Sequence, residues 1–147
     1  MKVALVHDFL VKLGGAERVL KVFADMYPKA PIFTLFYDEE KVGNVFPKER
    51  VITSNLQKYP KFIRKRYRLL LPKFPQAIED LDLEGYDLVL SSSTAMAHGI
   101  LTSIDTKHVC YCHSPIRYAW DWANEYRREN NINGIKMLLY APLMKYI

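Results

Sequence analysis

Short apolar runs alternate with amphipathic stretches along the chain. The first run, Val3 to Val6, is uninterrupted and is followed by the polar pair His7 and Asp8. An apolar run of this length predicts a strand that is covered on both faces of a parallel sheet. We therefore expect His7 and Asp8 to stand at the carboxyl end of a buried strand.

The stretch that follows the glycine pair Gly14 and Gly15 has helical periodicity. Its apolar positions fall on one face of a helix: Val19, Leu20, Phe23, Met26 and Tyr27. Two adjacent glycines allow a tight turn and a close approach of a ligand to the backbone. Because the free N–H groups and the positive dipole end of the helix face that turn, the stretch predicts an anion site. Neither the dinucleotide fingerprint nor the phosphate-loop motif of nucleotide-binding proteins is matched.

The same alternation continues downstream. It predicts further strands at residues 31–36, 50–53, 87–90 and 107–112, helices at 60–72, 76–81, 94–99, 118–128 and 132–147, and a loop at 41–48. Strands that alternate with helices at this spacing indicate stacked βαβ units. The sequence therefore predicts an α/β fold, a Rossmann-like three-layer domain with a mainly parallel twisted sheet over residues 1–147.

Polar residues gather where the predicted strands end. They are His7, Asp8, Asp38, Ser91, Ser92, Ser93, His113, Ser114 and Arg117. Ligands of such sheets bind beyond the carboxyl ends of the strands, near the point where the strand order reverses. His113 stands at a strand end, where a neutral imidazole can bind a sugar hydroxyl or a backbone carbonyl. The spacing indicates a binding edge and no Ser/His/Asp triad, and His98 and His108 are expected to be structural or surface residues.

The composition of the chain indicates where the protein is located and whether it binds a metal. No apolar run approaches the roughly 20 residues that span a bilayer, and polar residues follow the first strand too early for a signal peptide. Cys110 and Cys112 share one strand face but are poorly placed for a mutual disulfide. A C-x-C pair in a buried strand also lacks the loop geometry of zinc sites. We expect a cytoplasmic protein that requires no metal.

The net charge of +5 is concentrated in residues 58–74, which hold seven Lys and Arg residues and no acid, so the rest of the chain sums to −2. Three interpretations stay open: a peripheral membrane-surface patch, a solvated basic helix and a nucleic-acid surface. The first is favoured because Phe62, Tyr67 and three leucines interleave with the cations, an arrangement that attracts anionic lipids. The expected cations of this patch are Lys61, Arg64, Lys65, Arg66 and Arg68. No nucleic-acid recognition motif accompanies them.

Three motifs together resemble a known family. They are H-D-F-L-x-x-x-G-G-A-E-R at 7–18, S-S-S at 91–93 and Y-C-H-S-P-x-R-Y-A-W-D at 111–121. They are similar to the N-terminal domain of family 4 (group 1) glycosyltransferases, above all to bacterial mannosyltransferases of O-antigen and polysaccharide assembly. The resemblance covers essentially the whole chain. It implies one half of a GT-B architecture, in which the N-terminal domain mainly holds the acceptor and an absent C-terminal domain holds the nucleotide-sugar.

The resemblance also implies roles for individual residues. Gly14 and Gly15 would approach the donor diphosphate, and His113 would contact the donor sugar as the catalytic residue. The residues expected to line the cleft or the acceptor site are His7, Asp8, Ser91, Ser92, Ser114 and Arg117. The implied reaction is metal-independent transfer, with retention, of a hexose (mannose from GDP-mannose) to a glycan or lipid-linked acceptor.

Two further expectations concern the extent of the protein. The chain ends at Ile147 inside an apolar helical pattern, so we expect it to be part of a longer protein and to lack transfer activity on its own. The alternative function is a non-catalytic α/β module that binds a carbohydrate or a nucleotide. A dinucleotide oxidoreductase is disfavoured by the missing fingerprint.

Overall fold

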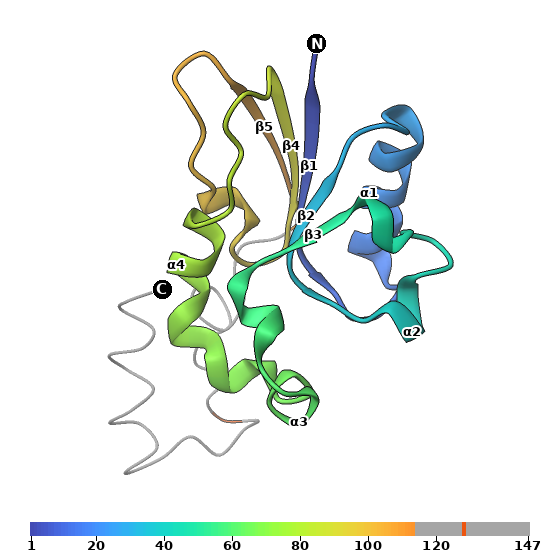
Figure 1. Ribbon diagram of the computed structural model, residues 1–147, viewed down its shortest axis with the longest axis vertical. Helices are drawn as coiled ribbons and strands as arrows, with labels where there is room; N and C mark the ends of the chain where they lie inside the picture. Colours follow the sequence, from blue (N-terminus) through green and yellow to red (C-terminus); the bar gives the residue numbers. More distant parts are fainter. Residues whose placement is uncertain (114–127, 129–147) are drawn as a thin grey trace. The chain divides into compact units, whose positions relative to one another are not determined.

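The computed structural model describes residues 1–113, apart from the side chain of Arg68, and Arg128 (Figure 1). In this part of the chain five strands form one parallel sheet in the order β3-β2-β1-β4-β5. The strands are β1 (Val3–Leu10), β2 (Ile32–Tyr37), β3 (Val51–Thr53), β4 (Leu88–Ser93) and β5 (Lys107–Cys112). The prediction of an α/β Rossmann-like domain with a parallel sheet is confirmed.

Short helices connect these strands. They are α1 (Gly15–Met26), α2 (Glu39–Val42), α3 (Lys61–Arg64) and α4 (Phe74–Glu79), with the 3₁₀ turns η1 (Lys48–Arg50), η2 (Asn55–Lys58), η3 (Tyr67–Lys73) and η4 (Ala97–Gly99). Residues 1–113 form one compact unit. Apart from Arg128, which is helical, the predicted helices 118–128 and 132–147 lie outside the described residues.

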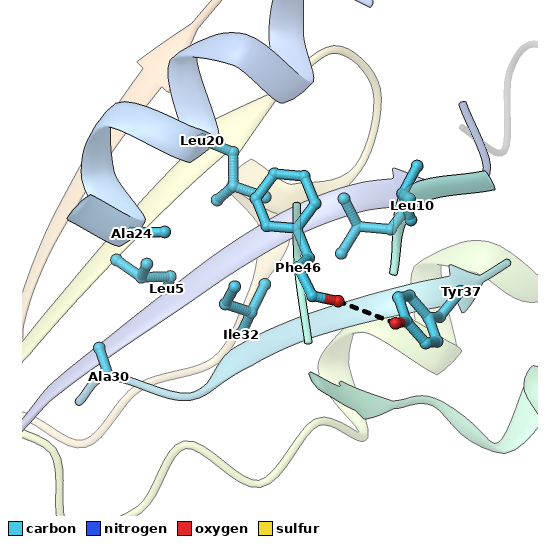
Figure 2. Close-up of a cluster of buried hydrophobic side chains, with 9 residues drawn as sticks. Leu5, Leu10, Leu20, Ala24, Ala30, Ile32, Tyr37 and Phe46 are labelled. Carbon is cyan, nitrogen blue, oxygen red and sulfur yellow. Dashed lines mark hydrogen bonds between the residues drawn. The ribbon is translucent and has the colours of Figure 1, made fainter. Parts of the chain in front are cut away.

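One face of the sheet is covered by α1. Leu20 and Ala24 of this helix pack on Leu5 and Ile32, and Phe46 closes the cluster, as Figure 2 shows. The expectation that Met26 belongs to the buried face is wrong, because Met26 is 61% exposed. Two residues correspond to about 200° of helical rotation, so a face that buries Ala24 turns Met26 to the solvent.

An aromatic cluster covers the opposite face. Phe9 of β1 and Phe36 of β2 contact Tyr67 of η3 and Phe74 of α4, with ring centroids 5.2 to 5.9 Å apart. Tilted and edge-on aromatic pairs of this kind each stabilise by about 1 kcal/mol beyond the area that they bury. The cluster therefore fixes the second half of residues 58–74, which we call the basic segment, to the sheet.

The basic segment itself differs from the predicted helix over 60–72. It forms α3, then a turn, then η3, which includes Pro72. Proline lacks an N–H and restricts the residue before it. Three successive leucines, Leu69 to Leu71, also cannot all lie on one face of a regular helix, and Leu69 is 71% exposed. The local sequence thus favours short turns over one continuous helix.

Two strands extend three or four residues beyond their predicted carboxyl ends. β1 continues to Leu10, so His7 and Asp8 lie within the strand, and β4 includes Ser91, Ser92 and Ser93. Part of the predicted loop 41–48 belongs to α2, and the predicted helix 94–99 is reduced to η4. β1 and β4 each have a parallel neighbour on both sides, so the backbone N–H and C=O groups of these polar residues can pair within the sheet.

Candidate functional site

The strand order reverses between β1 and β4. The chain builds β1, β2 and β3 toward one edge and then places β4 and β5 on the other side of β1. In doubly wound sheets this is the position where ligands bind, beyond the carboxyl ends of the strands. Gly14 and Gly15 follow β1, and His113 follows β5, so the structure brings these predicted site residues to the same edge of the sheet.

A series of contacts connects the glycine turn with His113. The Gly14 N–H donates to Glu17 Oε2 at 2.8 Å, and Glu17 Oε1 lies 3.7 Å from His7 Nε2. His7 Nδ1 is 2.8 Å from the carbonyl oxygen of Ser92, whose Oγ is 2.9 Å from His113 Nε2. These four contacts, which we call the rim relay, run across β1 and β4. The sequence predicted the ends of the relay but not the pairing of His7 with Glu17.

The His7–Glu17 pair at the centre of the relay is buried, with 2% and 8% of the two side chains exposed. A carbonyl oxygen can only accept, so His7 Nδ1 carries the hydrogen that it donates to Ser92. Burial acts to raise the pKa of Glu17, but the His7 ring and the backbone N–H groups of Glu17 and Gly14 outweigh it. The pKa therefore lies below the ordinary value of 4.5. Glu17 is an internal anion that holds the glycine turn in place.

His113 is held as a neutral imidazole. Burial lowers its pKa below 6.5, and the nearby His7 acts in the same direction, while Asp8 and Glu17 act against them. Tyr111 packs edge-on against the ring with centroids 4.9 Å apart. Since Nε2 faces Ser92, the Nδ1 atom of His113 is the ring nitrogen that can bind a ligand.

The two glycines do different things. A Cβ at Gly14 would lie 2.9 Å from Glu17 Oε2, so Gly14 makes room for the carboxylate that caps its N–H. At Gly15 a Cβ would meet no atom of the described residues within 4 Å. Gly15 begins α1, and the first N–H groups of a helix have no partner within the helix. The open space beside Gly15 is therefore the place where an anion can approach the end of α1.

Asp8 has a different position from the expected one. It is fully buried, and its carboxylate accepts hydrogen bonds from the four backbone N–H groups of residues 94–97 and from the hydroxyl of Thr94. We expected Asp8 to line the cleft. Instead Asp8 reaches across from β1 and closes the turn that follows β4, so its oxygens are occupied within the chain.

Each serine of the Ser91–Ser93 triplet bonds a different histidine. Ser92 bonds His113 in the rim relay, Ser91 Oγ is 2.8 Å from His108 Nε2, and Ser93 Oγ is 3.1 Å from His98 Nδ1. Alternation along β4 directs Ser91 and Ser93 to the face opposite Ser92.

As whole residues, these serines and His7 are at most 1% exposed. His7, Ser91 and Ser92 therefore support the edge of the sheet from inside. The sequence had predicted that they would line the cleft, but they are buried. His98 and His108 have the structural contacts that the sequence led us to expect.

Four further residues named in the sequence analysis are not part of the rim relay. Ser114 and Arg117 lie outside the described residues. Cys110 and Cys112 are exposed on β5, where we had expected a buried strand. Among residues 1–113 and Arg128, no group of three or more His, Cys, Asp or Glu side chains is arranged to hold a metal ion.

The lowered pKa values of His108 and His113 predict how the stability of the chain depends on pH. Burial lowers the pKa of both His108 and His113 below 6.5, so the folded chain binds fewer protons than the unfolded chain as the pH falls through this value. The free energy of unfolding, from urea titrations, should therefore be level above neutral pH and decline below pH 6.5. The double variant His108→Gln/His113→Gln should decline less steeply. Stability that rises on acidification through this range would contradict the assignment.

No described helix is long and apolar enough to cross a bilayer. Comparison of the chain with protein-family models, with curated proteins and with solved structures finds no match.

Proposed function

We propose that this chain is the N-terminal, acceptor-side half of a retaining GT-B glycosyltransferase, which moves a hexose from a nucleotide-sugar to a glycan or lipid-linked acceptor. The observation that carries the proposal is the rim relay, which joins the neutral imidazole of His113 to the open glycine turn at the start of α1. The sequence motifs at 7–18, 91–93 and 111–121 support it, since they supply most of the residues involved.

The chemistry of sugar transfer suits this arrangement. Transfer breaks the bond between the anomeric carbon and the diphosphate, and negative charge develops on the departing phosphate oxygen. The N-terminus of α1, whose first N–H groups have no partner within the helix, stabilises such a charge without a metal ion. A neutral His113 can accept or donate one hydrogen bond to a hydroxyl of the sugar and so orient it. GDP-mannose is the donor that the family resemblance favours.

The proposal includes a partner domain and a location. The nucleotide would be held by a C-terminal domain of the same polypeptide, and the protein would work in the cytoplasm, peripherally at the inner face of the membrane. On this account residues 1–147 alone have no transfer activity. Robust turnover of a nucleotide-sugar by these residues alone would contradict the division of labour between the domains.

A second candidate is a non-catalytic module that binds a carbohydrate or a nucleotide. It is favoured because the carboxylates of Asp8 and Glu17, at this edge of the sheet, are both hydrogen-bonded within the chain. Neither of them is therefore available to act on a substrate. The two candidates are separated by whether the natural reading frame continues into a second α/β domain and whether the complete polypeptide consumes a nucleotide-sugar.

The variant Gly15→Ala tests the proposed site. In the complete natural polypeptide, assayed with a panel of radiolabelled nucleotide-hexoses, the variant should transfer at least about tenfold more slowly, since a methyl group would occupy the path of the diphosphate to α1. The chain itself has room for this methyl group, and alanine favours a helix over glycine by up to about 1 kcal/mol. The urea midpoint should therefore stay unchanged or rise.

Gly99→Ala is the matched control, because within residues 1–113 a Cβ at Gly99 also meets no atom within 4 Å. It should transfer at the rate of the wild type. A normal rate in Gly15→Ala, or a complete polypeptide that uses no nucleotide-hexose, would contradict the proposal.

A further inference from the structure

A hollow lies at the carboxyl end of β2, apart from the residues proposed to contact the donor. It is a cleft of about 660 Å³, with α2 on one side and α3 on the other. Figure 1 shows both helices beyond the carboxyl ends of β1 and β2. The cleft has aromatic lining from Phe36, Tyr37 and Tyr67, and charged side chains supply most of the rest.

The charges of the cleft do not cancel. Three acidic side chains line it, and each is paired with a lysine: Asp38 with Lys41 at 3.0 Å, Glu39 with Lys48 at 3.4 Å and Glu40 with Lys61 at 2.9 Å. Arg64 and Lys65 also line the cleft, and neither pairs with a carboxylate of the described residues. The cleft therefore has two cations in excess.

Arg64 is held in place for an external anion. Its Nε donates to the carbonyl oxygen of Tyr59 at 3.0 Å, and the side chain is partly buried. This bond fixes the guanidinium plane and leaves the Nη donors available. A planar pair of N–H donors on one guanidinium matches two oxygens of a phosphate, and a neighbouring lysine adds a compact charge.

The outer side of the same segment exposes apolar residues beside the cations. Phe62 and Leu69 are each 71% exposed, and Lys61, Lys65 and Arg66 are exposed around them. No acidic residue occurs from position 58 to position 78. Exposed aromatic and aliphatic side chains among cations are typical of surfaces that enter the headgroup region of an anionic bilayer.

We propose that the cleft between α2 and α3 binds a phosphate-bearing group, from an anionic lipid headgroup or from a soluble phosphate, through Arg64 and Lys65. The aromatic side chains of the lining support the body of the ligand, and the exposed Phe62 and Leu69 bring a lipid to the opening of the cleft. The proposal does not depend on sugar transfer.

The first arm of the test uses inorganic pyrophosphate as a soluble probe of the 147-residue chain. Addition of pyrophosphate should shift the amide resonances of residues 36–41 and 61–67 in NMR spectra. Arg64→Gln/Lys65→Gln should bind it at least about tenfold more weakly, as expected for the loss of charge-assisted hydrogen bonds. The matched control is Lys29→Gln/Lys107→Gln, which removes the same charge from exposed positions before β2 and at the start of β5. It should bind like the wild type.

The second arm separates the two sources of phosphate. Flotation with vesicles of phosphatidylcholine, with or without phosphatidylglycerol, measures lipid binding. Phe62→Ser/Leu69→Ser should weaken binding to the anionic vesicles and leave pyrophosphate binding unchanged if the ligand is a lipid. Binding of pyrophosphate without binding to vesicles would support the same site with a soluble phosphate as its ligand.

Two results would overturn the proposal. One is the absence of pyrophosphate shifts in the cleft residues, even if vesicles bind, because general attraction to a basic surface would then suffice. The other is equal binding by Arg64→Gln/Lys65→Gln and by its matched control. Since no nucleotide-sugar is used, either result would leave the proposed donor site at Gly15 untouched.

Discussion

Replacement of Asp8 by alanine should lower the free energy of unfolding by about 3–5 kcal/mol, the range expected when a buried charge network loses its acceptor. The carboxylate accepts four backbone N–H groups and one hydroxyl, and the side chain is fully buried. Alanine would leave those donors unpaired. Urea unfolding followed by circular dichroism measures the loss, and a chain of this size should melt roughly 10 °C lower.

Thr94→Val is the matched control for Asp8→Ala. It removes the hydroxyl donor, one of the five bonds to the carboxylate, while the four backbone bonds remain. Its cost should be about 1 kcal/mol, the net contribution of one hydrogen bond. If Asp8→Ala costs no more than Thr94→Val, the carboxylate does not hold the turn after β4 as the structure indicates.

The second large effect is expected for His113→Ala in the complete polypeptide. The rate of sugar transfer should fall by about 100-fold or more, the scale at which a group that orients or stabilises the reacting centre contributes. Ser92 aligns the His113 ring, and on the proposed function the loss of this ring removes the hydrogen bond that orients the donor sugar. Steady-state kcat/KM at a fixed acceptor concentration is the quantity to compare.

The control for this variant is His108→Ala. His108 also bonds a serine of β4 at a similar distance, 2.8 Å against 2.9 Å, but on the opposite face of the sheet. It should lose stability to a similar extent and keep its transfer rate. His113→Gln, which retains a hydrogen-bonding side chain, should recover part of the lost rate. Undiminished transfer by His113→Ala would remove this residue from the site.

The sequence predicts the sheet well because each strand is encoded locally. The limits of β5 agree with the predicted residues 107–112, and β2 differs by one residue at each end, since an apolar run between turn residues needs no partner to be recognised. The gathering of Gly15 and His113 at one edge follows from the general geometry of parallel sheets.

Most contacts inside the site could not be predicted from the sequence. Asp8 and its hydrogen-bond donors lie 86 to 89 residues apart, and His7 bonds a carbonyl 85 residues away. No local pattern distinguishes a carboxylate that meets a ligand from one that closes a distant turn. The Glu17 bond to Gly14 is the exception, because a glutamate three residues after a helix cap is a recognisable signal.

The claim on which the account rests is that the turn at Gly15 and the ring of His113 contact the same ligand. Titration of the complete natural polypeptide with a nucleoside diphosphate hexose, followed by NMR, measures this most directly. The account predicts that the Gly15 amide and the His113 ring signals shift together with one dissociation constant. A shift at one position with none at the other, or at neither position at saturating donor, would contradict it.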